Sequence, residues 1–153
     1  MNDAPNTEIG FYHLEKWPLE TALPRLLGRA LERGLRVVVR TGSEERLDAL
    51  NAALWSHDPG SFLPHGGPGD GDADRQPVYL TTGDEVPNGA TVLVLTDRVE
   101  ATDLDRFERC IDMFDGSDDS VQAARARWRA LKDKDYALTY WQQTPAGKWE
   151  KKT

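Results

Sequence analysis

The sequence Leu35-Arg-Val-Val-Val-Arg-Thr-Gly-Ser43 is followed by a run with apolar residues at helical spacing up to Leu54. Its three successive valines predict a strand that is buried on both faces, as the strands of parallel sheets are. Ser43 provides the side-chain oxygen of a helix N-cap, and Glu44 and Glu45 suit the positive end of the helix dipole. A strand that leads through a short turn into a helix is the repeating unit of an α/β fold.

The same alternation continues on both sides of this unit. We expect further strands at residues 9–14, 76–81, 90–96 and 136–141, and further helices at residues 18–33 and 120–134. Residues 103–114 fit either one helix or a one-turn helix followed by a strand at 109–114, and the alternation favours the strand. The sequence therefore predicts an α/β fold, a three-layer sandwich with a mostly parallel sheet and a Rossmann-like topology. We expect one domain over residues 1–144 and a basic, loose C-terminal tail over residues 145–153.

Composition narrows the class of protein. At 153 residues the chain is one domain that is long enough to bury a hydrophobic core. No apolar run approaches the length of a membrane span, and the polar, acidic N-terminus is unlike a signal peptide. The single cysteine, Cys110, cannot form an internal disulfide, which favours a reducing compartment. We therefore expect a cytoplasmic protein that does not associate with a membrane.

Charge is distributed unevenly along the chain. Residues 120–153 hold 8 basic and 3 acidic residues, a net charge of +5, whereas residues 1–119 hold 11 basic and 23 acidic residues, a net charge of −12. A basic end on an acidic body indicates an interaction with a partner. The acidic body argues against general affinity for a phosphate backbone, because like charges repel at long range.

The basic end begins with the strongest predicted helix, residues 120–134, which holds several alanines and neither glycine nor proline. Asp118, Asp119 and Ser120 are expected to cap it. Its most distinctive side chains follow the spacing i, i+3, i+4 and i+7 and therefore share one face: Arg125, Trp128, Arg129 and Lys132. Three cations around an indole predict a receptor for an acidic ligand that also carries an apolar group. The alternative is that these cations only solvate the helix face and pair with the acidic body.

No segment carries a catalytic, metal or cofactor signature. The glycine-rich residues 66–74 lack the lysine and the spacing of a phosphate-binding loop, and a dinucleotide-binding fingerprint is absent. His57 and His65, with a nearby aspartate, would supply metal ligands, but surface or capping roles are favoured because their spacing matches no metal motif. Asp97 and Asp112 are interpreted as loop or capping residues near strand ends. We therefore expect a binding module without cofactor or metal rather than an enzyme.

Several motifs occur in a distinctive order along the chain. They are Phe11-Tyr-His-Leu14, Ala53-Leu-Trp55 with Ser61-Phe-Leu-Pro-His65, the strand before Asp97, Phe107-Glu-Arg109 with Asp112-Met-Phe114, and Ala124-Arg-Ala-Arg-Trp-Arg129 followed by Tyr140-Trp141. Together they resemble the chi subunit family of bacterial DNA polymerase III, over nearly the whole chain. The segment from Ala53 to His65 is the most specific part of this resemblance.

The resemblance implies an α/β fold without catalysis and an accessory role in the replicase. Chi subunits connect the clamp-loader assembly to single-stranded DNA-binding protein by gripping the acidic C-terminal tail of that protein, which ends in an apolar residue. Association with DNA is then indirect. Carried over to this sequence, the tail-binding positions fall on Arg125, Trp128 and Arg129. Lys132 joins them from helical spacing, and Val121 stands one turn earlier, where the family has a basic residue.

The resemblance also implies a second interface. Family contacts with the psi subunit involve the aromatic segment, which carries over to Trp55, Phe62 and Pro64. An equivalent clamp-loader subunit or a repair helicase is the alternative partner. Two other functions remain open. One is direct binding of single-stranded nucleic acid through Trp141, Trp149 and the basic tail, and the other is a Rossmann-like enzyme with a nucleotide at the switch point of the sheet.

Overall fold

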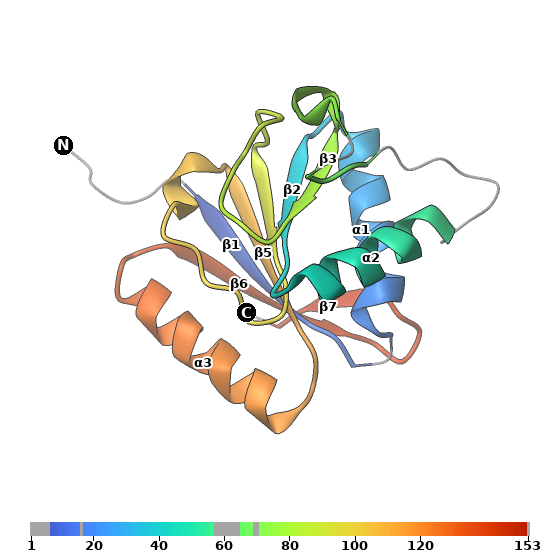
Figure 1. Cartoon of the computed structure of the whole chain (residues 1–153). Coiled ribbons are helices and arrows are strands. Elements are labelled where there is room, and N and C mark those ends of the chain that lie inside the picture. Colours follow the sequence, from blue (N-terminus) through green and yellow to red (C-terminus); the bar gives the residue numbers. More distant parts are fainter. Residues whose placement is uncertain (1–6, 16, 57–64, 69–70, 153) are drawn as a thin grey trace.

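The computed structural model describes residues 7–15, 17–56, 65–68 and 71–152, and its centre is a seven-stranded sheet. The strands are β1 (Glu8–His13), β2 (Val37–Arg40), β3 (Val78–Thr81), β4 (Val92–Leu95), β5 (Arg109–Phe114), β6 (Ala137–Gln143) and β7 (Trp149–Lys151). They lie in the order β3-β2-β4-β5-β1-β6-β7, and every neighbouring pair is parallel except β6 and β7 (Figure 1). The chain therefore enters the sheet at an interior strand, with β5 on one side of β1 and β6 on the other.

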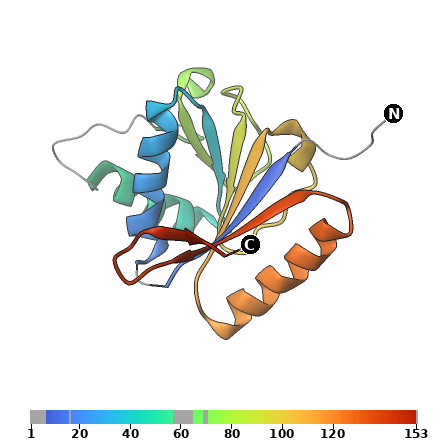
Figure 2. The ribbon, with the colours of Figure 1, turned by 180° about the vertical axis from the view of Figure 1, so that it is seen from behind.

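Helices cover both faces of this sheet. They are α1 (Leu19–Glu32), α2 (Glu44–Ser56) and α3 (Asp118–Lys132), with one-turn 3-10 helices at Ala73–Arg75 and Leu104–Arg106. Leu23 and Leu27 of α1 and Leu50 of α2 pack against one face of the sheet. Ala124 and Trp128 of α3 pack against the other face. Figures 1 and 2, drawn from opposite sides, show α3 in orange, well apart from α1 and α2. These helix layers and the sheet between them form a three-layer sandwich.

Strand β2 shows why the valine run is decisive. Val37 and Val39 belong to the core beneath α1 and α2, Val38 belongs to the core on the α3 side, and all three are fully buried. The turn after β2 leads into α2, where the Ser43 hydroxyl accepts a hydrogen bond from the Arg46 backbone N–H (3.2 Å). A strand that is apolar on both faces needs a covering layer on each of them, which a parallel sheet with helices on both sides provides.

The predicted α/β fold with a mostly parallel sheet is confirmed. The predicted strands and helices are all present, with small shifts of their boundaries. Residues 103–114 form a one-turn helix and then β5, which is the alternative that the alternation favoured. Within the described residues, no helix combines the length and the apolar content that crossing a bilayer requires.

The start of α3 differs from the prediction. Its N-cap is Ser117, whose hydroxyl accepts a hydrogen bond from the Ser120 backbone N–H (3.3 Å). Asp118, Asp119 and Ser120 belong to the first helical turn instead, where the two carboxylates still face the positive end of the helix dipole. The sequence offered several adjacent capping residues, and only the backbone geometry distinguishes the cap from the turn that follows it.

The end of the chain also differs from the expected loose tail. Residues Trp149–Lys151 form β7, which pairs antiparallel with the end of β6. Gly147 has a positive φ of 81° in the turn between the two strands. The indole of Trp149 meets the Tyr12 ring edge to face, with 5.0 Å between centroids. Ring packing and backbone pairing thus order a strand that is too short to give a pattern in the sequence.

Candidate functional site

A groove with a volume of about 710 Å³ lies between α3 and the strands β1, β5 and β6. The residues that line it are Phe11, His13, Phe114, Val121, Ala124, Arg125, Trp128, Arg129, Lys132 and Tyr140. The structure therefore brings together every α3 residue that the sequence assigned to tail binding. It adds four side chains from the strands and Ala124 from the helix.

Aromatic rings form the floor of this groove. The Trp128 indole meets the Phe11 ring edge to face, with 5.3 Å between centroids, and lies 6.4 Å from the Tyr140 ring. Phe11 and Tyr140 both contact Phe114, at 6.4 and 6.3 Å between centroids. Phe11 and Phe114 are buried, whereas Trp128 and Tyr140 are half-buried. Rings that pack in this way hold each other's orientation, so the floor is aromatic and rigid.

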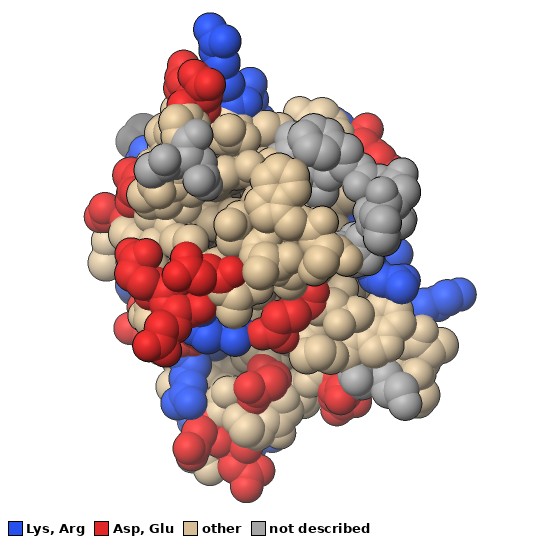
Figure 3. Space-filling model, turned by 45° about the vertical axis from the view of Figure 1, so that its right-hand side comes forward, with Lys and Arg blue, Asp and Glu red and all other residues tan. Residues whose placement is uncertain are grey.

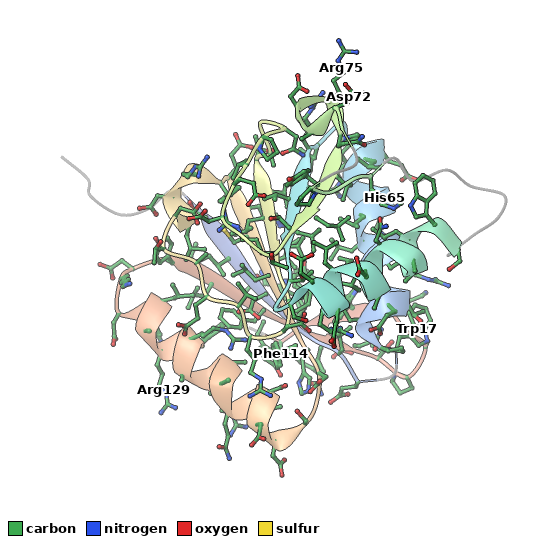
Figure 4. All side chains as sticks on the ribbon, in the orientation of Figure 1. Trp17, His65, Asp72, Arg75, Phe114 and Arg129 are labelled. Carbon is green, nitrogen blue, oxygen red and sulfur yellow. The ribbon has the colours of Figure 1, made fainter. Side chains whose placement is uncertain are left out.

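Three cations stand on the rim of the groove. Arg125, Arg129 and Lys132 are exposed, and none of them forms an ion pair with another residue in the described part of the chain. Figure 4 shows Arg129 projecting from α3, with Phe114 beside the helix. The acidic groups gather in larger clusters than the basic ones on the face that Figure 3 brings forward, the side of α2. Among the described residues, no carboxylate therefore forms an ion pair with these three cations.

Arg127 points the other way, from the same helix toward the sheet. Its guanidinium donates hydrogen bonds to both carboxylate oxygens of Asp112, at 2.7 and 2.9 Å. The two side chains are only 8% and 7% exposed. Burial raises the pKa of Asp112, and the hydrogen bonds from Arg127 oppose that shift. Asp112 lies within β5, so its interpretation as a loop or capping residue is wrong. The ion pair connects α3 to the sheet. Arg125 and Arg129, on the outer side of the same helix, are exposed.

Sequence reasoning missed the strand side of the groove. Phe11 and His13 are alternate residues of β1 and therefore share one face of the sheet. Tyr140 of β6 pairs directly with Phe11, and Phe114 at the end of β5 pairs with His13. Alternation within each strand was a visible signal. Assembling the four rings also required the order β5-β1-β6, which joins segments far apart in the sequence.

The residues assigned to a partner interface lie elsewhere. Trp55, near the end of α2, is 59% exposed, and its ring contacts the His65 ring with 4.5 Å between centroids. Phe62 and Pro64 lie outside the described residues, as does His57. Because α2 and α3 cover opposite faces of the sheet, the structure separates Trp55 from the groove. The described residues contain no group of three or more side chains suited to hold a metal ion.

The tryptophans considered for direct nucleic-acid binding lie on the face of the sheet opposite the groove. The Trp141 ring stacks on the Tyr12 ring, with 5.8 Å between centroids and an interplanar angle of 11°, and Trp149 meets the same tyrosine edge to face. Both tryptophans are half-buried and pack against the core beneath α1 and α2. Rings that are engaged with one another present less free surface for stacking with bases.

The carboxyl edge of the sheet, where Rossmann-like folds bind nucleotides, carries an internal ion pair. Arg40 at the end of β2 donates hydrogen bonds to both Asp103 carboxylate oxygens (2.6 and 2.8 Å) and to the Asp84 carbonyl (2.9 Å). The hydrogen bonds from Arg40 lower the pKa of Asp103. The Arg40 side chain is only 3% exposed. The positive charge of Arg40 is therefore paired with Asp103 within the fold and is not exposed to a ligand.

Comparisons with known proteins agree with the resemblance. The family model described as DNA polymerase III chi subunit, HolC, matches residues 7–139. A relative from Rickettsia prowazekii (strain Madrid E), named "Probable DNA polymerase III subunit chi", is 26% identical over 107 residues. That match covers 70% of this chain, and the chain spans 65% of the length of the relative. Because the family model extends from β1 into β6 and includes the whole of α3, the chain belongs to the DNA polymerase III chi subunit family.

Proposed function

We propose that this protein is a non-catalytic subunit of the DNA polymerase III holoenzyme whose groove binds the acidic C-terminal tail of single-stranded DNA-binding protein. In this role it links the clamp-loader assembly to that protein, and its association with DNA is indirect. One observation carries the proposal. A half-buried indole lies on a rigid aromatic floor, and the cations around it have no acidic partner among the described residues.

The physical chemistry of the groove suits such a tail. The carboxylates of the tail meet Arg125 and Arg129, whose guanidinium groups form charge-assisted hydrogen bonds with carboxylates. The terminal apolar side chain packs on Trp128 and the rings beneath it, and burying one such side chain contributes about 2 kcal/mol. Because the rim cations are exposed, salt screens them, so the affinity falls as ionic strength rises.

Calorimetric titration with a synthetic tail peptide tests this proposal. We expect Trp128→Ala or Arg125→Ala to bring binding below detection while the circular dichroism spectrum of the folded protein is kept. Arg33→Ala is the matched control, because it also removes one exposed cation, next to the end of α1 on the opposite face of the sheet. If the peptide binds both groove variants as tightly as it binds the native protein, the groove is not the tail site.

We also propose that Trp55 anchors the interface with a psi subunit, or with an equivalent clamp-loader or helicase partner, together with the segment that contains Phe62 and Pro64. The support is the 59% exposure of the Trp55 indole, since large aromatic side chains exposed on a surface are frequent anchors of protein interfaces. Trp55→Ala is expected to weaken co-purification of the partner subunit and to leave the affinity for the tail peptide unchanged. Unchanged co-purification, or a loss of peptide binding, would contradict this assignment.

A further inference from the structure

The aromatic floor of the groove contains one polar pair. The Nδ1 atom of His13 in β1 lies 2.6 Å from the hydroxyl oxygen of Tyr140 in the adjacent strand β6. The His13 ring also stacks on the Phe114 ring, with 5.0 Å between centroids and an interplanar angle of 21°. Both members of the pair line the groove. The imidazole is thus fixed by stacking, and it in turn fixes the position of the tyrosine hydroxyl.

The direction of this hydrogen bond follows from the other nitrogen of His13. If Tyr140 donated to Nδ1 of the neutral imidazole, the proton of His13 would be on Nε2. That atom is buried and has no hydrogen-bond partner among the described residues, and the Glu15 carboxylate oxygen is 4.0 Å away. Among backbone groups, a buried N–H without an acceptor is rarer than a buried acceptor without a donor, and the same cost applies here. We infer that His13 Nδ1–H donates to Tyr140, which leaves the tyrosine O–H for another acceptor.

The surroundings of Tyr140 indicate what that acceptor is. Burial and the nearby Glu15 raise the pKa of Tyr140, so its hydroxyl keeps the proton at neutral pH and acts as a donor. The Arg125 guanidinium lies close enough to act on Tyr140 electrostatically, in the opposite direction. Arg125 and Tyr140 line the same groove, so a carboxylate that pairs with Arg125 enters the groove that holds the tyrosine hydroxyl. In a peptide whose last side chain packs on the aromatic floor, the nearest carboxylate is that of the chain end.

The geometry points to Tyr140, held by His13, as the residue that makes the groove specific for a free peptide C-terminus, by donating a hydrogen bond to the terminal carboxylate. Tyr140 contacts the ligand, and His13 is a positioning residue that acts through it. This inference rests on the proposed function, since it requires a peptide tail in the groove. It goes beyond that function because the basic and indole groups of α3 would hold an acidic segment whether or not the chain ended there.

Two peptides of one sequence, with a free C-terminal carboxylate and with a C-terminal amide, test the inference. We expect the native protein to bind the acid about tenfold more tightly than the amide, because a hydrogen bond to a charged group is lost on amidation. Tyr140→Phe keeps the ring and its packing, so it is expected to bind the amide as the native protein does and to show a smaller preference for the acid. The part of the preference that remains is the part that Arg125 supplies by pairing with the charged chain end. His13→Leu is expected to reduce the preference for the acid, since the hydroxyl then loses its orientation.

The outcomes separate the inference from the proposed function. If the native protein binds neither peptide, both fail. If it binds acid and amide equally, or if Tyr140→Phe keeps the full preference for the acid, the tail site stands and the role of Tyr140 is refuted. If Tyr140→Phe does not fold, the ratio of acid to amide affinity in His13→Leu decides, and an undiminished ratio there refutes the role of the pair.

Discussion

Arg127→Leu and Arg129→Leu remove one arginine each from α3, two positions apart, and we expect them to have opposite consequences. Arg127 is 8% exposed and bonded to both oxygens of Asp112, whereas Arg129 is exposed on the rim of the groove. Arg127→Leu should therefore destabilise the fold and leave the tail affinity of the folded protein nearly unchanged. Arg129→Leu should weaken binding of the tail peptide and leave the free energy of unfolding nearly unchanged.

The size of the first effect follows from the burial of the pair. Without Arg127, the Asp112 carboxylate stays in the core between α3 and β5 with no opposite charge beside it. Removing one partner of a buried ion pair costs about 3–5 kcal/mol. A domain of this kind is stable by only about 5–15 kcal/mol, so the loss is a large fraction of the total. For Arg129→Leu, a surface substitution without an ion pair, we expect a change within about 0.5 kcal/mol.

The deficit of Arg127→Leu, its loss in free energy of unfolding relative to the native protein, should also depend on pH. Burial raises the pKa of Asp112, and in the variant the hydrogen bonds that oppose this shift are gone. A carboxyl group whose pKa is higher in the folded than in the unfolded state takes up a proton on folding, so it stabilises the folded state increasingly as the pH falls. The deficit should therefore shrink as the pH falls from neutral toward the unfolded pKa of the carboxyl group. A second substitution, Asp112→Asn, should recover part of it at neutral pH.

Urea unfolding followed by tryptophan fluorescence measures these free energies, and titration with the tail peptide measures the affinities. The reasoning is refuted if Arg127→Leu unfolds at the same urea concentration as the native protein, or if its deficit grows as the pH falls. Equal losses of stability in Arg127→Leu and Arg129→Leu would also refute it, because the two arginines would then have the same structural role.

Three further substitutions test other parts of the fold by urea unfolding. Ser117→Ala removes the N-cap of α3 and should cost about 1 kcal/mol, whereas no loss would mean that the cap is not used. Asp103→Asn should cost roughly 3 kcal/mol at neutral pH, because it leaves the buried Arg40 without its partner. The pKa of Asp103 is lowered in the folded state, so its contribution is present above the unfolded pKa and the deficit should vanish as the pH falls through the folded pKa. Gly147→Ala should cost more than about 1 kcal/mol, because the position has φ 81° and a Cβ there would collide with the Trp17 indole.

The helix side of the groove was predictable from the sequence because the α-helical repeat fixes relative positions within one element. Arg125, Trp128, Arg129 and Lys132 share a face in any structure that makes residues 120–134 helical, and all four line the groove. Arg127 was not distinguishable from its neighbours on these grounds. It is one of three arginines at alternate positions, and only the placement of Asp112 beneath the helix shows that this one is part of the core.

The strand side was not predictable in the same way, because a sheet brings together residues whose separation in the sequence carries no information about contact. Alternation within β1 places Phe11 and His13 on one face, but it does not say that β6 is the neighbour that brings Tyr140 opposite Phe11. The internal ion pair of Arg40 with Asp103 depends on the same kind of long-range placement. Local periodicity predicts elements, whereas a site built across strands requires the order of those strands.

The position of the groove matches the distribution of paired and unpaired cations among the described residues. In many α/β proteins the carboxyl edge of the sheet binds the ligand, but here Arg40 and Asp103 form an ion pair with each other at that edge. Arg125, Arg129 and Lys132, on the outer face of α3, have no acidic partner among the described residues. On the inner face of the same helix, the Arg127–Asp112 ion pair connects α3 to the sheet. Trp55 lies on a helix of the opposite layer. The proposed tail site and the proposed partner interface therefore lie on opposite sides of the sheet, so a ligand at one does not block the other.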